Sequence, residues 1–446
     1  MDEVERTTPM EIPGGAPLPI PPDEAADDGP RRQIHLGILG RSPNFTPRQM
    51  RVFFIASTAG FFDQYDRALL SLALKQIQAG LHVAEAHLGA MLSFIRLGYI
   101  LSLLITPLAD VFGRRKLLLY TIVGYTIFTA LSAIAPAERT FIIAQLLARA
   151  FAGAEATIAL VILAEEVDAA HRGWAIGLLS AVSSMGYGLA ALVFALVFVI
   201  PYGWRGMYAL ALIPLIAIIP LQRILPESQR FEAEARSGEQ PTRVWQPMIQ
   251  LFRAYPGRLA LMLSVSFLAS MGAGSAGILL PKFLQEVHGY SPANVSTLFF
   301  VGGGLGILGN IIAGRLSDRF GRRSMGALFM FLAPLLTIWI YTAPGFSVAP
   351  AWTLELFFDT AAGTILGAYS AELFPTSHRS TAGSALAVAG TTGGAIGLLL
   401  EGVLYGLTGS HWIAVRYLTV FWMIAPFIML FFPETAGREL EAISPE

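Results

Sequence analysis

Ionisable residues lie inside long apolar stretches of this sequence, where a charge is costly and therefore points to a functional role. Asp63 and Asp66 are three positions apart, so a helix presents both carboxylates on one face. Glu155 lies in a later apolar stretch. Burial favours the protonated form of a carboxyl group and a nearby arginine favours the charged form, so such a group can carry a proton across a membrane. We predict that Asp63, Asp66 and Glu155 are proton-coupling residues, with Asp63 or Asp66 as the leading carrier.

Arginine and aromatic residues in the same kind of stretch are candidates to bind a solute. Arg149 stays charged when buried and can hold a carboxylate with two hydrogen bonds, so we expect it to meet a substrate carboxylate or to expel the proton from its carrier. The alternative is a permanent structural ion pair between Asp63 and Arg149. Arg96 has a structural alternative to substrate binding. Its guanidinium could pair with a carboxylate of its own half or extend toward the membrane surface. The predicted substrate-binding residues are Tyr65, Arg96, Arg149, Tyr187 and Asp359.

Twelve apolar stretches carry these residues, and each is long enough to cross a bilayer as a helix. Hydrophobic residues make up 54% of the chain and charged residues 14%, with a mean hydropathy of +0.59, which is too apolar for a soluble protein of this length. The charges gather between the apolar stretches, as expected where lipid is the solvent. The predicted spans are residues 50–73, 88–109, 117–136, 139–163, 173–199, 205–224, 258–282, 293–313, 324–343, 349–371, 380–405 and 411–432.

Short polar motifs recur along the chain in the same order and at a nearly constant offset of 207 or 208 positions. They are Asp110-Val-Phe-Gly-Arg-Arg115 with Asp318-Arg-Phe-Gly-Arg-Arg323, Glu165 and Arg172 with Glu372 and Arg379, and Pro226-Glu-Ser228 with Pro433-Glu-Thr435. The chain therefore consists of two homologous halves. Such halves are a common construction for transporters that alternate access around a central site.

Composition predicts the domain boundaries and the orientation. Residues 1–47 are rich in proline, glycine and acidic side chains and cannot bury a core, so we expect a disordered tail there. Six-helix bundles are predicted over 48–225 and 258–433, with a linker over 226–257 and a C-terminal tail over 434–446. Arginine clusters follow every second span and the opposite loops hold few basic residues, so both termini are predicted to be cytoplasmic.

Other kinds of chemistry have no support in the sequence. The chain contains no cysteine, which excludes disulfides and thiolate metal sites. No His/Glu cluster has metal-ligand spacing, and no serine lies in a nucleophile elbow. The glycines at 302–304 lie inside an apolar span without a Walker lysine, so they form no phosphate loop. We predict no metal, no cofactor and no enzymatic activity, and an ion or solute gradient as the energy source.

The motif around Asp110 and its copy around Asp318 resemble the loop signature of the major facilitator superfamily, and the resemblance covers about residues 50–440. It implies an all-α integral membrane fold of twelve transmembrane helices in two pseudo-symmetric six-helix bundles. It also implies a cytoplasmic gate whose contacts, each worth on the order of 1 kcal/mol, stabilise one packing of the bundles and break in the other. Charges that only fix the topology are the alternative. The gate residues would be Asp110, Gly113, Arg114, Arg115, Glu165, Arg172, Glu227, Arg230, Asp318, Gly321, Arg322, Glu372, Arg379 and Glu434.

Further motifs narrow the branch of this superfamily that the chain resembles. Asp63-Gln-Tyr-Asp66 resembles the Asp-Gly-Tyr/Phe-Asp signature of aromatic-acid/proton symporters, with glutamine in place of glycine. Residues 265–277 lack the paired glutamines with which hexose porters hold a sugar, which disfavours a hexose substrate. Residues 177–188 lack the Gly-Pro step of drug/proton antiporters, which disfavours drug export.

We therefore predict a secondary active transporter of the plasma (inner) membrane that moves a small organic solute, an organic anion, by proton symport. Tyr65-Asp66-Arg67 and Gly153-Ala-Glu155-Ala156 also resemble spinster-type lipid transporters, so an exporter or an amphipathic-solute transporter is the alternative. A polytopic sensor or enzyme is a third hypothesis, which leaves the duplicated motifs unexplained. The expected partners are the solute, protons and the lipid bilayer, without nucleic acid, and the expected state is a monomer.

Overall fold

The computed structural model describes residues 45–167, 169–210, 212, 246–306, 308–375 and 378–436, and every regular element in them is a helix. We call residues 47–212 the first half and residues 246–436 the second half. The predicted tail before residue 45, the predicted linker up to residue 245 and the residues after 436 lie outside this description.

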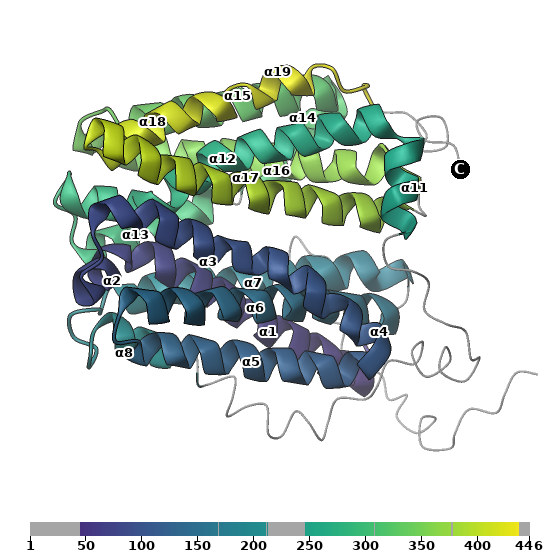
Figure 1. The fold of residues 1–446 in the computed structure, drawn as a ribbon. Coiled ribbons are helices and arrows are strands. Elements are labelled where there is room, and N and C mark those ends of the chain that lie inside the picture. The colour runs from purple at the N-terminus through teal and green to yellow at the C-terminus, as the bar shows by residue number, and fades with distance from the viewer. Residues whose placement is uncertain are drawn as a thin grey trace, which may run out of the picture. The chain divides into compact units, whose positions relative to one another are not determined.

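The long helices of the first half follow one another in the chain as antiparallel neighbours (Figure 1). They are α1 (Pro47–Leu72), α2 (Leu74–Leu81), α3 (Glu85–Ile105), η2 (Thr106–Leu108), α4 (Ala109–Phe112), α5 (Arg114–Ile134), α6 (Glu138–Glu166), α7 (Ala169–Phe194) and α8 (Trp204–Ala209).

The second half repeats this arrangement (Figure 1). Its helices are α11 (Gln246–Ala254), α12 (Pro256–Glu286), α13 (Pro292–Gly306), α14 (Leu308–Phe320), α15 (Arg322–Ile340), η3 (Gly345–Ser347), α16 (Val348–Glu372), α17 (Arg379–Thr408), α18 (His411–Trp422) and α19 (Ala425–Met429).

The helices agree with eleven of the twelve predicted spans, and the span predicted over 205–224 falls largely outside the described residues. Nine helices of the described residues are long and apolar enough to cross a membrane. Two further helices coincide with predicted spans but are more polar, because α1 carries Asp63 and Asp66 and α16 carries Glu355 and Asp359. Acidic residues thus interrupt one span in each half.

Helix α12 runs further than the sequence indicates. The predicted span ends at residue 282, whereas α12 continues to Glu286 and buries Lys282, whose exposed fraction is 1%. Lys282 Nζ lies 3.1 Å from Glu85 of α3 and 2.9 Å from Glu286. The helix can extend through a buried lysine because two carboxylates compensate the charge.

The first residues of α5 and α15 show that the backbone repeats along with the sequence. Gly113 precedes α5 with φ 92° and ψ 137°, and Gly321 precedes α15 with φ 94° and ψ 137°. Residues with a Cβ atom are strained at such a φ, so glycine is required at both turns. The two glycines are 208 positions apart, which is the offset of the sequence motifs.

Close helix contacts also occur at equivalent places in the two halves. A Cβ atom on Gly186 of α7 would collide with the backbone oxygen of Phe61 in α1. A Cβ atom on Gly393 of α17 would collide in the same way with the backbone oxygen of Phe267 in α12. Small residues that let backbones approach are a typical device of helix packing in membranes.

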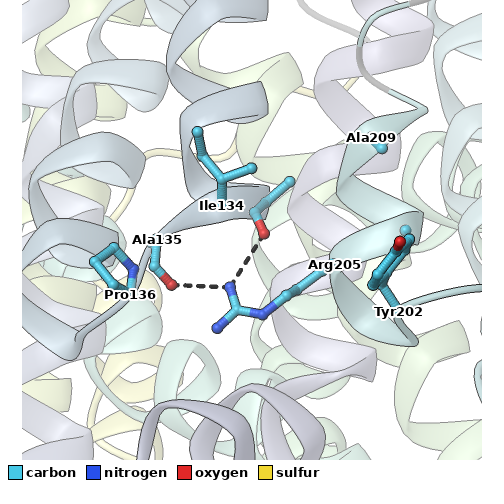
Figure 2. A pocket seen from close by; sticks show the side chains of 8 residues that line it. Ile134, Ala135, Pro136, Tyr202, Arg205 and Ala209 are labelled. Carbon is cyan, nitrogen blue, oxygen red and sulfur yellow. Dashed lines mark hydrogen bonds between the residues drawn. The ribbon is translucent and has the colours of Figure 1, made fainter.

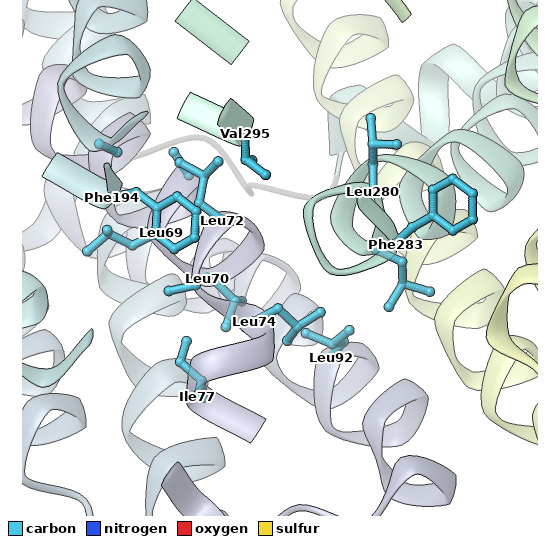
Figure 3. Packing of buried hydrophobic residues seen from close by; sticks show 14 of the residues in the cluster. Leu69, Leu70, Leu72, Leu74, Ile77, Leu92, Phe194, Leu280, Phe283 and Val295 are labelled. Carbon is cyan, nitrogen blue, oxygen red and sulfur yellow. The ribbon is translucent and has the colours of Figure 1, made fainter. Parts of the chain in front are cut away.

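The two halves pack together at the end of the molecule where α1 ends and α3 begins. Leu72 of the first half and Leu280 and Phe283 of the second half belong to one buried hydrophobic cluster there (Figure 3). Gln76 Nε2 donates a hydrogen bond to Gln285 Oε1 across this contact, at 2.7 Å. The two halves are therefore in direct contact at that end.

Further hydrogen bonds join the halves close to this contact. Ser71 Oγ donates to the Ile278 carbonyl at 3.1 Å, and Ser93 Oγ donates to the Ala395 carbonyl at 2.7 Å. We call this end, with α2 and the start of α18, the seam end. The opposite end, with Gly113 and α4, is the motif end (Figure 1).

Candidate functional site

A buried ion pair joins α1 to α6. Asp66 is fully buried, and its Oδ2 atom lies 2.8 Å from Nη1 of Arg149, which is 2% exposed. The Arg149 guanidinium also donates to the Asp66 carbonyl at 3.1 Å and to Gln145 Oε1 at 3.2 Å. Gln145 lies one turn before Arg149, so one face of α6 supplies both side chains. The sequence-predicted proton carrier and the predicted arginine therefore lie in direct contact.

A second, more accessible ion pair lies beside the first. Asp63 Oδ2 is 2.9 Å from Arg67 Nη2, and the Arg67 side chain is 44% exposed. Tyr99 of α3 connects the two pairs, because its hydroxyl donates to Asp63 Oδ1 at 3.3 Å and accepts from Arg149 Nη1 at 3.4 Å. Arg149 thus pairs with Asp66 rather than with Asp63, the pairing that the sequence left open.

The Asp66 carboxylate is held by charge more than by hydrogen bonds. Within the described residues neither of its oxygens accepts a well-aligned hydrogen bond, although Arg149 is in contact. Protonation of such a carboxylate removes its attraction to Arg149 and breaks few hydrogen bonds. The Arg149 charge would then stay buried without a partner, which is costly unless another anion takes the place of the carboxylate. The arrangement can therefore link protonation to a change of partner at Arg149.

Three other predicted residues of the first half lie around this cluster rather than in it. Glu155 of α6 is 2% exposed, and within the described residues its Oε2 atom has no hydrogen-bond partner. Tyr65 is buried, and its hydroxyl donates to the Met207 carbonyl of α8 at 3.0 Å, so it packs the first half. Tyr187 of α7 stacks on Phe299 of α13, with ring centroids 6.2 Å apart, and so reaches the second half.

Arg96 and Asp359 come from opposite halves and both keep accessible surface. Arg96 lies on α3 and is half-buried, and among the described residues it has no ion pair or hydrogen bond. Asp359 lies on α16, one turn after Glu355, and both acidic residues are half-buried as well. Within the same residues, neither Arg96 nor Asp359 is hydrogen-bonded to the pair formed by Asp66 and Arg149.

At the motif end of the second half, predicted gate residues gather where α15 begins. Arg322 lies 3.3 Å from Asp318 and 2.5 Å from Glu372. Glu434 accepts hydrogen bonds from the backbone N–H groups of Arg322, at 2.8 Å, and Arg323, at 3.2 Å. These N–H groups are among the first of α15 and have no partner inside the helix, so the carboxylate caps it. The residues brought together are Asp318, Gly321, Arg322, Glu372 and Glu434.

The remaining predicted gate residues are distributed differently. Gly113 directly precedes α5, Arg114 is buried with 8% exposure, and Arg115 is half-buried. Arg379 Nε donates to the Phe374 carbonyl at 3.3 Å. A gate that spans both halves stays a prediction. Outside the described part of the chain lie the side chains of Asp110, Glu165 and Arg172 and the whole of Glu227 and Arg230.

A charged cluster that the sequence did not predict lies at the seam end. Lys282 of α12 contacts Glu85, whose Oε2 atom is also 2.9 Å from His411 Nε2. His411 Nδ1 lies 2.5 Å from Glu401 Oε1, and both of these residues are buried. Glu85 belongs to the first half and the others to the second, so the cluster fastens the halves together. The partners are 197 and 326 positions apart, which no local sequence pattern can indicate.

A pocket of about 340 Å³ lies at the seam end of the first half, beside α5 and α8 (Figure 2). Its arginine, Arg205, donates to the carbonyls of Ala133, at 3.1 Å, and Ala135, at 2.8 Å, where α5 ends (Figure 2). A cation that satisfies the last carbonyls of a helix has a structural use. The rest of the lining is mostly apolar, so this pocket offers no chemistry for coupling.

Sequence reasoning missed part of the cluster around Asp66. Gln145 is four positions before Arg149, and Arg67 is four positions after Asp63, a spacing that places each pair on one helix face and could have identified both. The role of Tyr99 depends on how α3 packs against α1, and the sequence carries no signal for it.

The chain is similar to known proteins over most of its length. The model of the Major Facilitator Superfamily matches residues 56–366 of the chain. A probable 4-methylmuconolactone transporter of Cupriavidus pinatubonensis is 27% identical over 415 residues, which are 89% of this chain and 94% of that protein. The benzoate transport protein of Acinetobacter baylyi is 23% identical over 85% of this chain and 88% of its own length.

Among solved structures, the inward-open xylose transporter XylE of E. coli resembles this chain with a TM-score of 0.69 and 18% sequence identity. The similarity covers 89% of this chain and 99% of that one. At this identity the likeness concerns the fold, and it extends over both halves.

Proposed function

We propose that this chain, which belongs to the major facilitator superfamily, imports a small organic anion together with protons. The family match confirms the predicted all-helical membrane fold and the prediction that the chain is a multi-pass transporter of small organic solutes rather than an enzyme. The direction, the coupling ion, the substrate class and the roles of single residues are the parts that we propose here.

The buried pair of Asp66 and Arg149 is the observation that carries the proposal. In our scheme Asp66 takes up a proton from the side where protons are plentiful, and the ion pair breaks. The approach of the Arg149 guanidinium later drives the proton off toward the other side, because the re-formed pair favours the carboxylate. One proton therefore moves in each cycle. Arg149 acts mainly on the proton in this scheme, since its donors are already engaged by α1 and α6.

Two further acidic residues support this role of Asp66. Asp63 holds Arg67 and Tyr99 and so keeps the neighbouring charges in place when Asp66 is neutral. Glu155 is a second buried carboxyl group, on α6, and serves as an alternative proton site.

Tyr187 and Asp359 are the proposed contacts to the substrate. Tyr187, stacked on Phe299 between the halves, offers an aromatic surface for a ring-containing substrate, and Asp359 contributes a polar group from the second half.

The packing of the two halves suggests which conformation this is. The hydrophobic cluster and the charged contacts of Glu85 close the seam end. Because the arginine motifs favour a cytoplasmic position, we infer that the motif end faces the cytoplasm and that the seam end is the outer one. Both termini are then cytoplasmic, in the plasma membrane, and the gate residues around Arg322 and Gly113 act at the inner face. We expect the protein to work as a monomer, within the domain boundaries that the sequence predicts.

The substrate class rests on chemistry and on the relatives together. Asp63 and Asp66 balance the charges of Arg67 and Arg149, but among the described residues Arg96 on α3 has no acidic partner, and such a cation suits an anionic solute better than a neutral one. The proteins that this chain resembles include a benzoate transport protein and a probable 4-methylmuconolactone transporter. We therefore propose a small carboxylate, with an aromatic or unsaturated carbon skeleton, as the substrate.

Uptake into proteoliposomes tests the proposal. Labelled benzoate, nicotinate and cis,cis-muconate would be supplied with and without an inward proton gradient, and the entry of the neutral acid into protein-free vesicles would be subtracted. With one proton per monovalent anion, each pH unit of gradient supports about tenfold accumulation, since it is worth about 1.4 kcal/mol. We expect wild-type protein to accumulate at least one of these carboxylates. Asp66→Asn should abolish the accumulation and preserve exchange of labelled for unlabelled substrate, which needs no net proton transfer.

The control is Glu138→Gln, which removes a carboxylate at the first residue of α6, away from the buried pair. It should accumulate substrate like the wild type. Wild-type uptake that ignores the proton gradient, or full accumulation by Asp66→Asn, would refute proton coupling through this residue.

A further inference from the structure

The guanidinium of Arg96 is a charge without a counter-charge among the described residues. It stands in the apolar span Glu85–Leu108, where a single uncompensated charge is expensive. Two other arginines of the first half, Arg67 and Arg149, each have an aspartate within 3 Å. Arg96 therefore requires a different explanation from its neighbours.

Two glycines of the second half make room for this guanidinium. A Cβ atom on Gly274 of α12 would lie 2.9 Å from Arg96 Nη1, and one on Gly394 of α17 would lie 2.5 Å from Arg96 Nη2. The built Cβ of Gly274 is also only 3.4 Å from the Gly394 Cα, so both glycines border the same place. A side chain of the first half thus ends in a gap that only glycine leaves open in the second half.

The surroundings of Arg96 are accessible and polar. Arg96 and the nearby Tyr99 are half-buried, and 44% of the Arg67 side chain is exposed. Packed core residues such as Tyr65, at 1%, show no such exposure. Because Asp63 balances the charge of Arg67, the net charge at this place is the single positive charge of Arg96.

We propose that Arg96 is the receptor for the carboxylate of the substrate and that Gly274 and Gly394 are positioning residues that hold its guanidinium between the halves. This inference rests on the proposed function and names the group that selects the anion. The planar guanidinium fork matches a carboxylate with two parallel hydrogen bonds. The bound carboxylate supplies the missing counter-charge. When the halves move relative to each other, the group between them is then a neutral pair of Arg96 and carboxylate instead of an isolated cation. Substrate binding is thereby linked to the conformational change.

Gly394→Ala is the sharpest variant, because the built Cβ meets only the far end of a flexible side chain. The helix keeps its backbone and the guanidinium must swing away. Gly383→Ala on the same helix is the matched control, since nothing lies within 4 Å of a Cβ at that position. Arg96→Gln removes the charge and Arg96→Lys keeps it without the fork.

The experiment measures binding to the purified full-length protein by thermal shift and calorimetry. The probes are benzoate and nicotinate, each compared with its neutral amide, benzamide and nicotinamide. We expect at least one carboxylate to stabilise the wild type and the Gly383→Ala variant, while its amide does not. Arg96→Gln should abolish the shift, and Arg96→Lys and Gly394→Ala should each weaken binding at least tenfold.

Three results would overturn the inference. The first is unchanged carboxylate binding by Arg96→Gln, and the second is equal binding by Gly394→Ala and Gly383→Ala. The third is a wild-type protein that binds the amides as tightly as the carboxylates, or that binds neither the amides nor the carboxylates. The inference concerns binding and the proposed function concerns proton coupling, so they fail separately. Unchanged binding by Arg96→Gln overturns the role of Arg96 whatever Asp66→Asn does in uptake.

Discussion

Glu434 carries its charge at the start of α15, outside the spans, and its environment makes a prediction about pH. Partial burial alone would favour the protonated acid, but the N–H groups of Ala436, Arg322, Arg323 and Thr435 hold the pKa of the Glu434 carboxyl below its ordinary value of 4.5. The unfolded chain has the ordinary pKa, so the folded state binds the proton more weakly. The stability that Glu434 contributes is complete above pH 4.5 and is lost as the pH falls through the lower, folded-state pKa.

We therefore expect Glu434→Gln to lower the melting temperature at neutral pH and to show a smaller additional loss than wild type between about pH 5 and 3. Thermal unfolding of both proteins across this range measures the difference. Asp318→Asn is the control, because its side chain is 67% exposed and an exposed ion pair contributes less than about 1 kcal/mol. The same acid-induced loss in wild type and Glu434→Gln would contradict the capping role.

Single residues also show where local patterns suffice and where they do not. The positions of Asp66 and Arg149 could be predicted, because a charge inside an apolar run is visible in the sequence. The partner of each arginine could not, except for Arg67, which is one turn after Asp63. The pairing of Arg149 with Asp66 is decided by how α1 and α6 pack, over 83 positions of sequence.

Equivalent helix pairs, α1 with α7 and α12 with α17, approach closely at a glycine in each half. Gly186 and Gly393 face backbone atoms of Phe61 and Phe267, which cannot rotate away, so a methyl group must push the helices apart. We expect Gly186→Ala and Gly393→Ala to destabilise the protein by about 1–3 kcal/mol each. Unfolding of the purified variants in detergent measures the effect.

Matched controls exist on the same two helices. Gly177 of α7 and Gly383 of α17 have nothing within 4 Å of a built Cβ. Alanine there should be neutral or stabilising, since a helix prefers alanine over glycine by up to about 1 kcal/mol. If all four variants behaved alike, the close approach would not be what holds these helix pairs.

The two-half construction could be read from the sequence because motifs and glycine turns repeat at one offset. Most span positions followed from the lengths of the apolar runs. The end of α12 did not, because the burial of Lys282 depends on Glu85 of the other half, 197 positions away. The contacts between the halves at the seam end, including the one between His411 and Glu85, could likewise not be predicted from the sequence.

At the scale of the whole molecule, we propose that each substrate anion enters together with a proton that Asp66 carries. The direct measurement is proton flux into weakly buffered proteoliposomes that contain a pH-sensitive dye, after a carboxylate is added without an imposed gradient. Protein-free vesicles give the passive entry of the neutral acid, which is subtracted. We expect wild-type protein to acidify the lumen in step with uptake of labelled substrate and Asp66→Asn to exchange substrate without acidification. Substrate entry into wild-type vesicles with no acidification beyond the protein-free background would contradict the account.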